Sequence, residues 1–148
     1  MLVFACICAQ VEKGIDALEK AEEHSESPLE TILYINAMTL IQTMKQCPEF
    51  HIDLENYPEA KLKLYDKYVS LIWSKYVGLF FKCIEEKLFL PDVDLHMLLD
   101  FLMQQPKTTF TGYYAGNDYN LSRYINTTIT FLSGVSTDLG RSELNRLK

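Results

Sequence analysis

The segment Ser27–Gln46, which reads SPLETILYINAMTLIQTMKQ, decides the fold class of this chain. Ser27 is a suitable N-cap for a helix, with Pro28 at the first helical position and Glu30 at the third. No charged residue follows Glu30 until Lys45, and apolar residues occupy every side of the predicted helix. Because such a helix is normally enclosed by other elements, the segment predicts the centre of a helical bundle.

Uncharged polar residues lie among the apolar ones in this segment, at Asn36, Thr39, Gln42 and Thr43. Buried polar groups are nearly always hydrogen-bonded, so each of these side chains needs a partner once the helix is enclosed. That partner is either another part of the protein or a bound ligand, and the sequence leaves both open.

The segments on either side of this helix extend the helical pattern. Leu2–Glu23 has apolar residues at steps of three and four and charged residues opposite them, which predicts an amphipathic helix. Its first two turns, Leu2–Ala9, are apolar on all sides, so we expect them to pack against another element. Cys47 ends the uncharged helix, and Pro48–Tyr57 is expected to be a short connecting turn or helix.

Pro58–Leu88 predicts the longest helix of the chain. Its apolar residues cover most of the circumference, so we expect it to be the helix around which the others pack. Gly78 lies inside it, and a glycine there costs about 1 kcal/mol relative to alanine. We therefore expect another backbone to approach closely at Gly78.

Two shorter helices are predicted in the last third of the chain, over Asp92–Gln104 and Asp118–Gly134. A polar and aromatic loop, Gln105–Gly116, separates them, and a polar tail follows from Thr137. The sequence thus predicts one all-α domain over residues 1–148, an antiparallel helical bundle of five main helices with a short connecting helix.

Composition narrows the function classes. The chain has 148 residues, 48% of them apolar, and a formal net charge of −6, which makes it a poor nucleic-acid binder on its own. The four cysteines lie inside apolar runs without disulfide or metal spacing, as free thiols do in a reducing compartment. No segment has the uncharged apolar length of a membrane span. We expect a cytoplasmic protein with no membrane partner.

Motifs of catalysis and cofactor binding are not found in the sequence. It contains no glycine-rich phosphate loop, dinucleotide fingerprint, serine elbow or zinc-protease motif, and the three histidines lie in different segments. We therefore expect no enzyme, no cofactor and no metal. An enzyme that uses Glu or Tyr as acid and base is the third hypothesis, and it requires a cleft with a strongly perturbed carboxylate.

Large adaptable side chains are dense on the two central predicted helices. Ordinary core packing explains any one of them, but a pocket between helices would use the same residue types, with a few hydroxyls and amides to orient a guest. The candidate ligand-binding residues are Tyr34, Asn36, Met38, Tyr65, Tyr68, Val69, Ile72, Trp73 and Tyr76.

The order of segments resembles the C-terminal effector-binding and dimerisation domain of TetR-type transcriptional repressors. The resemblance covers nearly the whole chain, from the first helix and the Ser-Pro junction through Cys47–Phe50 and Asp53–Pro58. Glu86–Asp94 resembles the turn before the first dimerisation helix of that family, and Ile129–Val135 resembles the end of the second. The order of these segments carries the resemblance.

Family members carry an N-terminal helix-turn-helix module that reads DNA, and no segment of this sequence corresponds to it. We expect a ligand-sensing and dimerisation domain that contacts DNA only through that missing module, either as a fragment or as a natural truncation. The resemblance implies that a small apolar or aromatic effector tilts the first helix and thereby controls DNA binding.

The resemblance also implies a homodimer formed by Asp92–Gln104 and Asp118–Gly134, which would pair with their two-fold mates in a four-helix bundle. Its expected interface residues are Leu98, Phe101, Leu102, Tyr124, Ile125, Thr128, Ile129 and Leu132. The alternative function is a helical protein-interaction scaffold without a ligand, in which the central aromatic residues serve only to pack the core.

Overall fold

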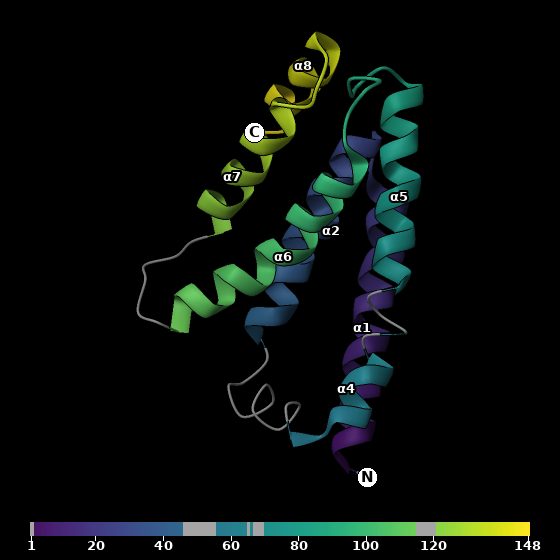
Figure 1. The fold of residues 1–148 in the computed structure, drawn as a ribbon, viewed down its shortest axis with the longest axis vertical. Coiled ribbons are helices and arrows are strands. Elements are labelled where there is room, and N and C mark those ends of the chain that lie inside the picture. Colours follow the sequence, from purple (N-terminus) through teal and green to yellow (C-terminus); the bar gives the residue numbers. More distant parts are fainter. Residues whose placement is uncertain (1, 46–55, 65, 67–69, 115–120) are drawn as a thin grey trace.

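The structure is a computed structural model that describes residues 2–45, 56–64, 66, 70–114 and 121–148. Its elements are helices (Figure 1), namely α1 (Leu2–His24), α2 (Pro28–Lys45), α4 (Pro58–Leu64), α5 (Ser70–Glu85), α6 (Leu95–Tyr114), α7 (Leu121–Ser133) and α8 (Asp138–Arg146). Phe89 and Ser136 form an isolated antiparallel bridge. The prediction of an all-α chain is confirmed for the described residues, and none of their helices has the length and apolar character needed to cross a bilayer.

Helix α2 lies at the centre of the structure. The hydroxyl of Ser27 accepts a hydrogen bond from the backbone N–H of Glu30 at 3.2 Å, so the predicted N-cap is confirmed. Beyond this cap, α2 contacts α1, α5, α6, α7 and α8. Leu29 and Ile32 are fully buried on it, and Ile35 is 1% exposed. The enclosure predicted from the missing charges is therefore confirmed for this part of α2.

Helix α5 is not the helix around which the others pack, so that prediction was wrong. It packs mainly against α2 and α6, and it leaves Trp73 39% exposed and Phe81 58% exposed. The physical reason is that only one side of α5, with Ile72, Tyr76 and Phe80, packs against those helices, and among the described residues no further helix covers the other sides. Lys75 pairs with Glu22 of α1 at 2.8 Å, and Lys82 is exposed.

The long helix predicted over Pro58–Leu88 is represented by α4 and α5, and residues 65 and 67–69 between them lie outside the described residues. The cysteine-proline break and the connecting segment over 46–55 also lie outside them, as does the predicted start of the last main helix at residue 118. Helix α7, from Leu121 to Ser133, confirms the last predicted main helix within these limits.

Helix α6 differs from the prediction at both ends. It begins at Leu95 rather than Asp92, because the Asp94 carboxylate accepts a hydrogen bond from the backbone N–H of Met97 at 3.1 Å. It continues to Tyr114, so the loop predicted from Gln105 was wrong over its first ten residues. The loop residues are weak helix formers, but propensity is a weak prior that an existing helix can override.

The tail predicted from Thr137 was also wrong, because Asp138–Arg146 forms α8. The hydroxyl of Thr137 accepts a hydrogen bond from the backbone N–H of Gly140 at 3.1 Å and caps this helix. An acid in the first turn, Asp138, and a base in the last, Arg146, match the helix dipole. The sequence contains these start and stop signals, but the segment is too polar to show the repeat of apolar residues that predicts a helix.

Two glycines have opposite surroundings. A Cβ atom at Gly140 would overlap the backbone carbonyl of Leu88, which lies in the turn between α5 and α6. A Cβ atom at Gly78 would have no heavy atom within 4 Å, so the close approach predicted there was wrong. The position that requires glycine is therefore in α8, at its contact with the α5–α6 turn.

We predict that Gly140→Ala lowers the free energy of unfolding by about 1–3 kcal/mol, because the added methyl group forces α8 away from Leu88. The matched control, Gly78→Ala, is expected to raise it by up to about 1 kcal/mol through better helix propensity. Urea unfolding followed by circular dichroism measures both values. Equal effects of the two substitutions would contradict the docked position of α8.

Candidate functional site

A buried cluster of uncharged polar side chains connects α2, α6 and α7. Asn36 is 1% exposed and Thr128 is fully buried. The Thr128 hydroxyl lies 2.9 Å from the Asn36 Oδ1 atom and 2.9 Å from the Gln105 Oε1 atom. The Asn36 amide donates to the same Gln105 oxygen at 3.3 Å, and the Gln105 amide donates to the backbone carbonyl of Tyr124 at 3.4 Å.

This cluster shares one hydroxyl proton among several acceptors. The Thr128 hydroxyl has the side chains of Asn36 and Gln105 within reach, and also the Tyr124 carbonyl one turn earlier at 3.2 Å. Since a hydroxyl donates one hydrogen bond at a time, the cluster has alternative patterns of donation. The cluster fixes the position of α2 relative to α6 and α7. If one of these helices moved along another, buried polar groups would lose their hydrogen-bond partners.

The sequence left open whether the partner of Asn36 is a ligand or the protein. In the structure its amide oxygen and nitrogen both have protein partners, Thr128 and Gln105. Thr39 likewise donates to the backbone carbonyl of Ile35 at 2.8 Å, while the side chains of Gln42 and Thr43 lie outside the described residues.

The other predicted ligand-binding residues are distributed over different surroundings. Ile72 is 3% and Tyr76 1% exposed in the core, where the Tyr76 ring stacks on Phe80 with a centroid distance of 5.8 Å. Trp73 meets the edge of the His96 ring on the outside at 6.1 Å. Tyr34 is exposed and Met38 is partly exposed. The side chains of Tyr65, Tyr68 and Val69 lie outside the described residues.

Most of the predicted dimer residues lie inside the chain itself. The buried ones are Leu98, Leu102, Tyr124, Thr128, Ile129 and Leu132, while Phe101 and Ile125 are partly exposed. A second copy would therefore meet the other side of α6 and α7, and the dimer stays a prediction.

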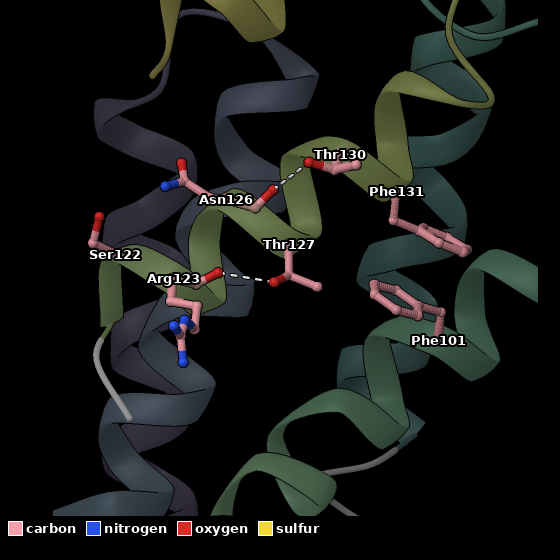
Figure 2. Close-up of a pocket in the computed structure, with 7 residues that line it drawn as sticks. All are labelled: Phe101, Ser122, Arg123, Asn126, Thr127, Thr130 and Phe131. Carbon is pink, nitrogen blue, oxygen red and sulfur yellow. Dashed lines mark hydrogen bonds between the residues drawn. The ribbon is translucent and has the colours of Figure 1, made fainter. Parts of the chain in front are cut away.

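An open hollow of about 680 Å³ lies on that other side, between α6 and α7 (Figure 2). Phe101 of α6 and Phe131 of α7 stack at one end of it, with ring centroids 3.8 Å apart and planes at 10°. The rest of its lining comes from the exposed side of α7, namely Ser122, Arg123, Asn126, Thr127 and Thr130.

The polar wall of the hollow carries hydroxyl and amide groups and a single charged side chain, the guanidinium of Arg123. The hydroxyl of Thr127 donates to the Arg123 carbonyl at 2.9 Å and that of Thr130 to the Asn126 carbonyl at 2.8 Å (Figure 2). Each oxygen keeps a lone pair toward solvent, so the wall can accept hydrogen bonds while the phenylalanines offer an apolar surface.

Of these lining residues only Phe101 was predicted as a site residue. The sequence contains a signal for the others, because Ser122, Asn126 and Thr130 recur every four residues, as do Arg123 and Thr127. This spacing places polar groups along one side of a helix. Solvated helix surfaces have the same spacing, so the signal alone does not indicate a site.

The titratable side chains of the described residues form no metal-ligand cluster, and the one strongly shifted thiol is buried. No three His, Cys, Asp or Glu side chains among them lie together as metal ligands. Burial, with a further contribution from the charge of Glu86, raises the pKa of the Cys83 thiol to about 12. That thiol is therefore neutral at physiological pH and a poor nucleophile.

Comparisons of the chain with protein-family models, with curated proteins and with solved structures find no significant match.

We predict that Thr128→Val lowers the free energy of unfolding by about 1–3 kcal/mol, because it removes the hydroxyl and leaves the buried amide oxygen of Asn36 without its donor, while Gln105 keeps the Asn36 amide. The control is Ser74→Val at an exposed position of α5, outside the proposed interface, where an effect within about 0.5 kcal/mol is expected. Chemical denaturation of both variants gives the comparison. A loss at Ser74 equal to that at Thr128 would show that the buried cluster contributes nothing specific.

Proposed function

We propose that the chain is the effector-sensing and dimerisation domain of a TetR-type transcriptional regulator, in which another module reads DNA. The observation that carries the proposal is the uncharged helix α2 at the centre of the bundle. It follows α1 through the Ser-Pro junction, and it contacts both α6 and α7, the helices assigned to dimerisation. One element thus touches the first helix and the proposed dimer helices, as an allosteric coupling between them requires.

The exposure pattern along α2 supports an effector site near its second half. Leu29–Ile35 is buried except for Glu30 and Tyr34. In the next turns Asn36 and Leu40 are buried, whereas Ala37, Met38, Thr39 and Ile41 are partly exposed although no charge accompanies them. Covering such an exposed apolar surface on a central helix removes it from water and so lowers the free energy of the folded state. We propose that a small apolar or aromatic effector covers this stretch, with Met38 as an adaptable contact.

The mechanism follows from the contacts of α2. An effector that binds more tightly to one angle between α1 and α2 shifts the population toward that angle, and only this difference in affinity does so. Leu18 and Ala21 of α1 are buried at its C-terminal half, so the angle is set by packing near the junction. A change of angle there displaces the N-terminal end of α1 most.

The proposed dimer uses the exposed side of α6 and α7. The hollow there has no carboxylate in its lining, while the chain as a whole carries a net charge of −6. Two copies that meet at this side avoid the repulsion expected elsewhere on the surface. The stacked Phe101 and Phe131 supply the apolar contact, and the hydroxyl groups of α7 supply hydrogen bonds across an isologous interface.

We predict that a screen of apolar and planar aromatic compounds finds ligands that raise the melting temperature. A compound at one hundred times its Kd stabilises the folded state by about 2.7 kcal/mol, which raises Tm by about 5–10 °C for a chain of this size. Met38→Lys is expected to abolish the shift. Met97→Lys, at a methionine exposed on α6, is the matched control and retains it. A shift that survives Met38→Lys contradicts this position for the effector.

We predict a dimer of about twice 17.1 kDa in size-exclusion chromatography with light scattering. Thr127→Glu places a carboxylate in the proposed interface, and burying it without a partner raises the dissociation constant about a hundredfold. Ser74→Glu, at an exposed position of α5, serves as the control and leaves the dimer intact. A wild-type monomer at micromolar concentration overturns the dimer.

A helical protein-interaction scaffold is the second candidate. The observation in its favour is the outward position of large apolar side chains, with Leu62 63%, Phe81 58% and Tyr57 51% exposed. Such side chains suit a protein partner better than a small ligand. The compound screen separates the two candidates, because a scaffold without a ligand site shows no saturable shift of Tm.

A further inference from the structure

The segment that follows α7 holds two turns of the chain at once. One is the α1–α2 turn, residues 25–27, and the other is the α5–α6 turn, residues 86–94. We call residues 135–146 the C-terminal clasp, since they bond to both. In Figure 1 the clasp and these turns lie at the same end of the molecule, opposite the N-terminal end of α1.

The first half of the clasp binds the α5–α6 turn through its backbone. The N–H of Thr137 donates to the Leu88 carbonyl at 3.0 Å, and the N–H of Leu90 donates to the Val135 carbonyl at 2.9 Å. The Thr137 hydroxyl adds a hydrogen bond to the Lys87 carbonyl at 2.6 Å. Gly140 lets α8 lie directly against Leu88.

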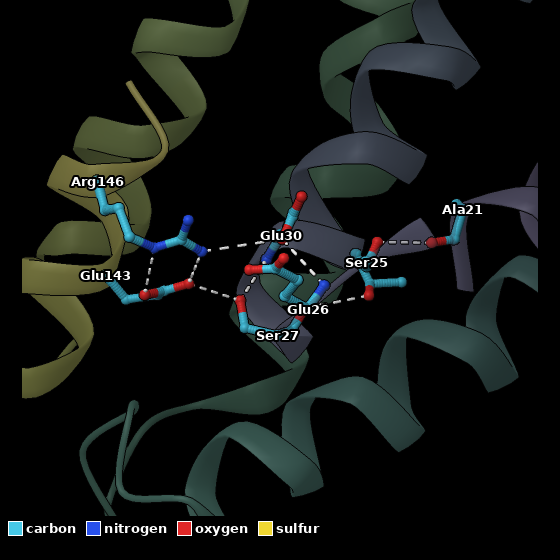
Figure 3. Close-up of polar contacts among 8 residues, drawn as sticks. Ala21, Ser25, Glu26, Ser27, Glu30, Glu143 and Arg146 are labelled. Atoms are coloured by element: carbon cyan, nitrogen blue, oxygen red, sulfur yellow. Dashed lines mark hydrogen bonds and ion pairs between the residues drawn. The ribbon is translucent and has the colours of Figure 1, made fainter. Parts of the chain in front are cut away.

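The second half of the clasp binds the α1–α2 turn through side chains (Figure 3). The Ser27 hydroxyl donates to the Glu143 carboxylate at 2.8 Å. Arg146 donates to the same carboxylate from two nitrogens, at 2.6 and 3.0 Å, and lies 3.9 Å from the carboxylate of Glu30. Glu30 in turn accepts from the backbone N–H of Glu26 at 3.0 Å.

Glu143 is the centre of this half. It is the acceptor for both Ser27 and Arg146, so its loss removes the side-chain hydrogen bond between Ser27 and α8, while Ser27 can still cap α2. Hydrogen bonding from Arg146 lowers the pKa of Glu143, with Ser27 adding to this, so the carboxylate is ionised at neutral pH.

The clasp is anchored to the core by few apolar side chains. Leu144 of α8 is fully buried and Val135 packs against the core, whereas Arg146 keeps 52% of its side chain exposed. Segments with few buried apolar contacts and exposed hydrogen bonds open locally at a lower free energy than the core. The bonds of Glu143 are therefore a large share of what holds α8 to the α1–α2 turn.

We propose that the C-terminal clasp is a releasable lock on the α1–α2 turn, with Glu143 as its positioning residue. While the clasp is closed, the turn from which α1 extends is fixed to α8 and, through it, to the α5–α6 turn. When α8 opens, Ser27 and Glu30 lose these partners and the angle between α1 and α2 is less constrained. The clasp goes beyond the proposed function, because it concerns the turn and not the effector or the dimer.

Hydrogen–deuterium exchange of the full chain tests the proposal. Glu143→Ala is expected to speed exchange about tenfold in residues 138–147, and also in the first turn of α2, whose amides at Glu30 and Thr31 bond to Ser27. Exchange in the buried part of α5 is expected to stay unchanged. Asn145→Ala, at an exposed position of α8, is the matched control and leaves both segments protected.

Three outcomes overturn the lock. Faster exchange in α8 with an unchanged α1–α2 turn shows that the clasp does not hold the turn. Faster exchange in α5 as well shows that the segment is part of the global unfolding unit and is not releasable. Equal effects of Glu143→Ala and Asn145→Ala show that Glu143 has no special role. Glu143→Gln keeps the shape and an acceptor for Ser27, and an intermediate exchange rate with it supports the lock. No readout uses DNA, an effector or a dimer, so failure here is distinct from failure of the proposed function.

Discussion

The absence of charge from α2 is the constraint on which the rest of the structure depends. Between Glu30 and Lys45 no ionised group can hold any side of the helix in water, so neighbours must enclose it. Because the helix is enclosed, its buried amide and hydroxyl groups need hydrogen-bond partners inside the protein. The partners of Asn36 are Thr128 and Gln105. The same lack of charge thus determines both the centre of the bundle and the position of its buried polar cluster.

The contrast between α2 and α5 shows why apolar content alone does not decide which helix is central. Both segments have apolar residues on most of their circumference, but α5 also carries Lys75 and Lys82. Burying an ammonium group is costly, so Lys75 and Lys82 keep part of the circumference of α5 at the surface. Trp73 lies about half a turn away from both lysines, so its exposure has another cause, namely that one side of α5 packs against α2 and α6 and the described helices leave the rest of its circumference open.

Local and strong signals predicted the structure correctly. The cap at Ser27 and the enclosure of the first part of α2 rest on residues within one helix, and both are confirmed. The errors at α8, in the second half of α6 and at Gly78 have different causes. The polar sequence of α8 hides its helical repeat, the residues after Gln104 stay helical against their average propensity, and no other backbone approaches Gly78. Gly140 is required by a carbonyl fifty-two residues earlier, at Leu88, and no local pattern predicts such a pairing. The hollow between α6 and α7 also depends on two segments that are apart in the sequence, because Phe101 of α6 and residues of α7 line it together.

The two sides of α7 determine what kind of dimer the proposal allows. Its apolar residues, including Tyr124, Ile129 and Leu132, are already buried in the core of the same chain. A partner would therefore meet Asn126, Thr127 and Thr130 beside the phenylalanine pair, which is a polar interface with an apolar edge. Such an interface retains water and owes its specificity to hydrogen-bond geometry more than to buried area. Because Thr128 lies on the opposite side of the same helix, in the cluster with Asn36, any shift of α7 at the interface acts directly on the partners of α2. In this proposal α7 alone separates the dimer contact from the central helix α2, so it would couple the two.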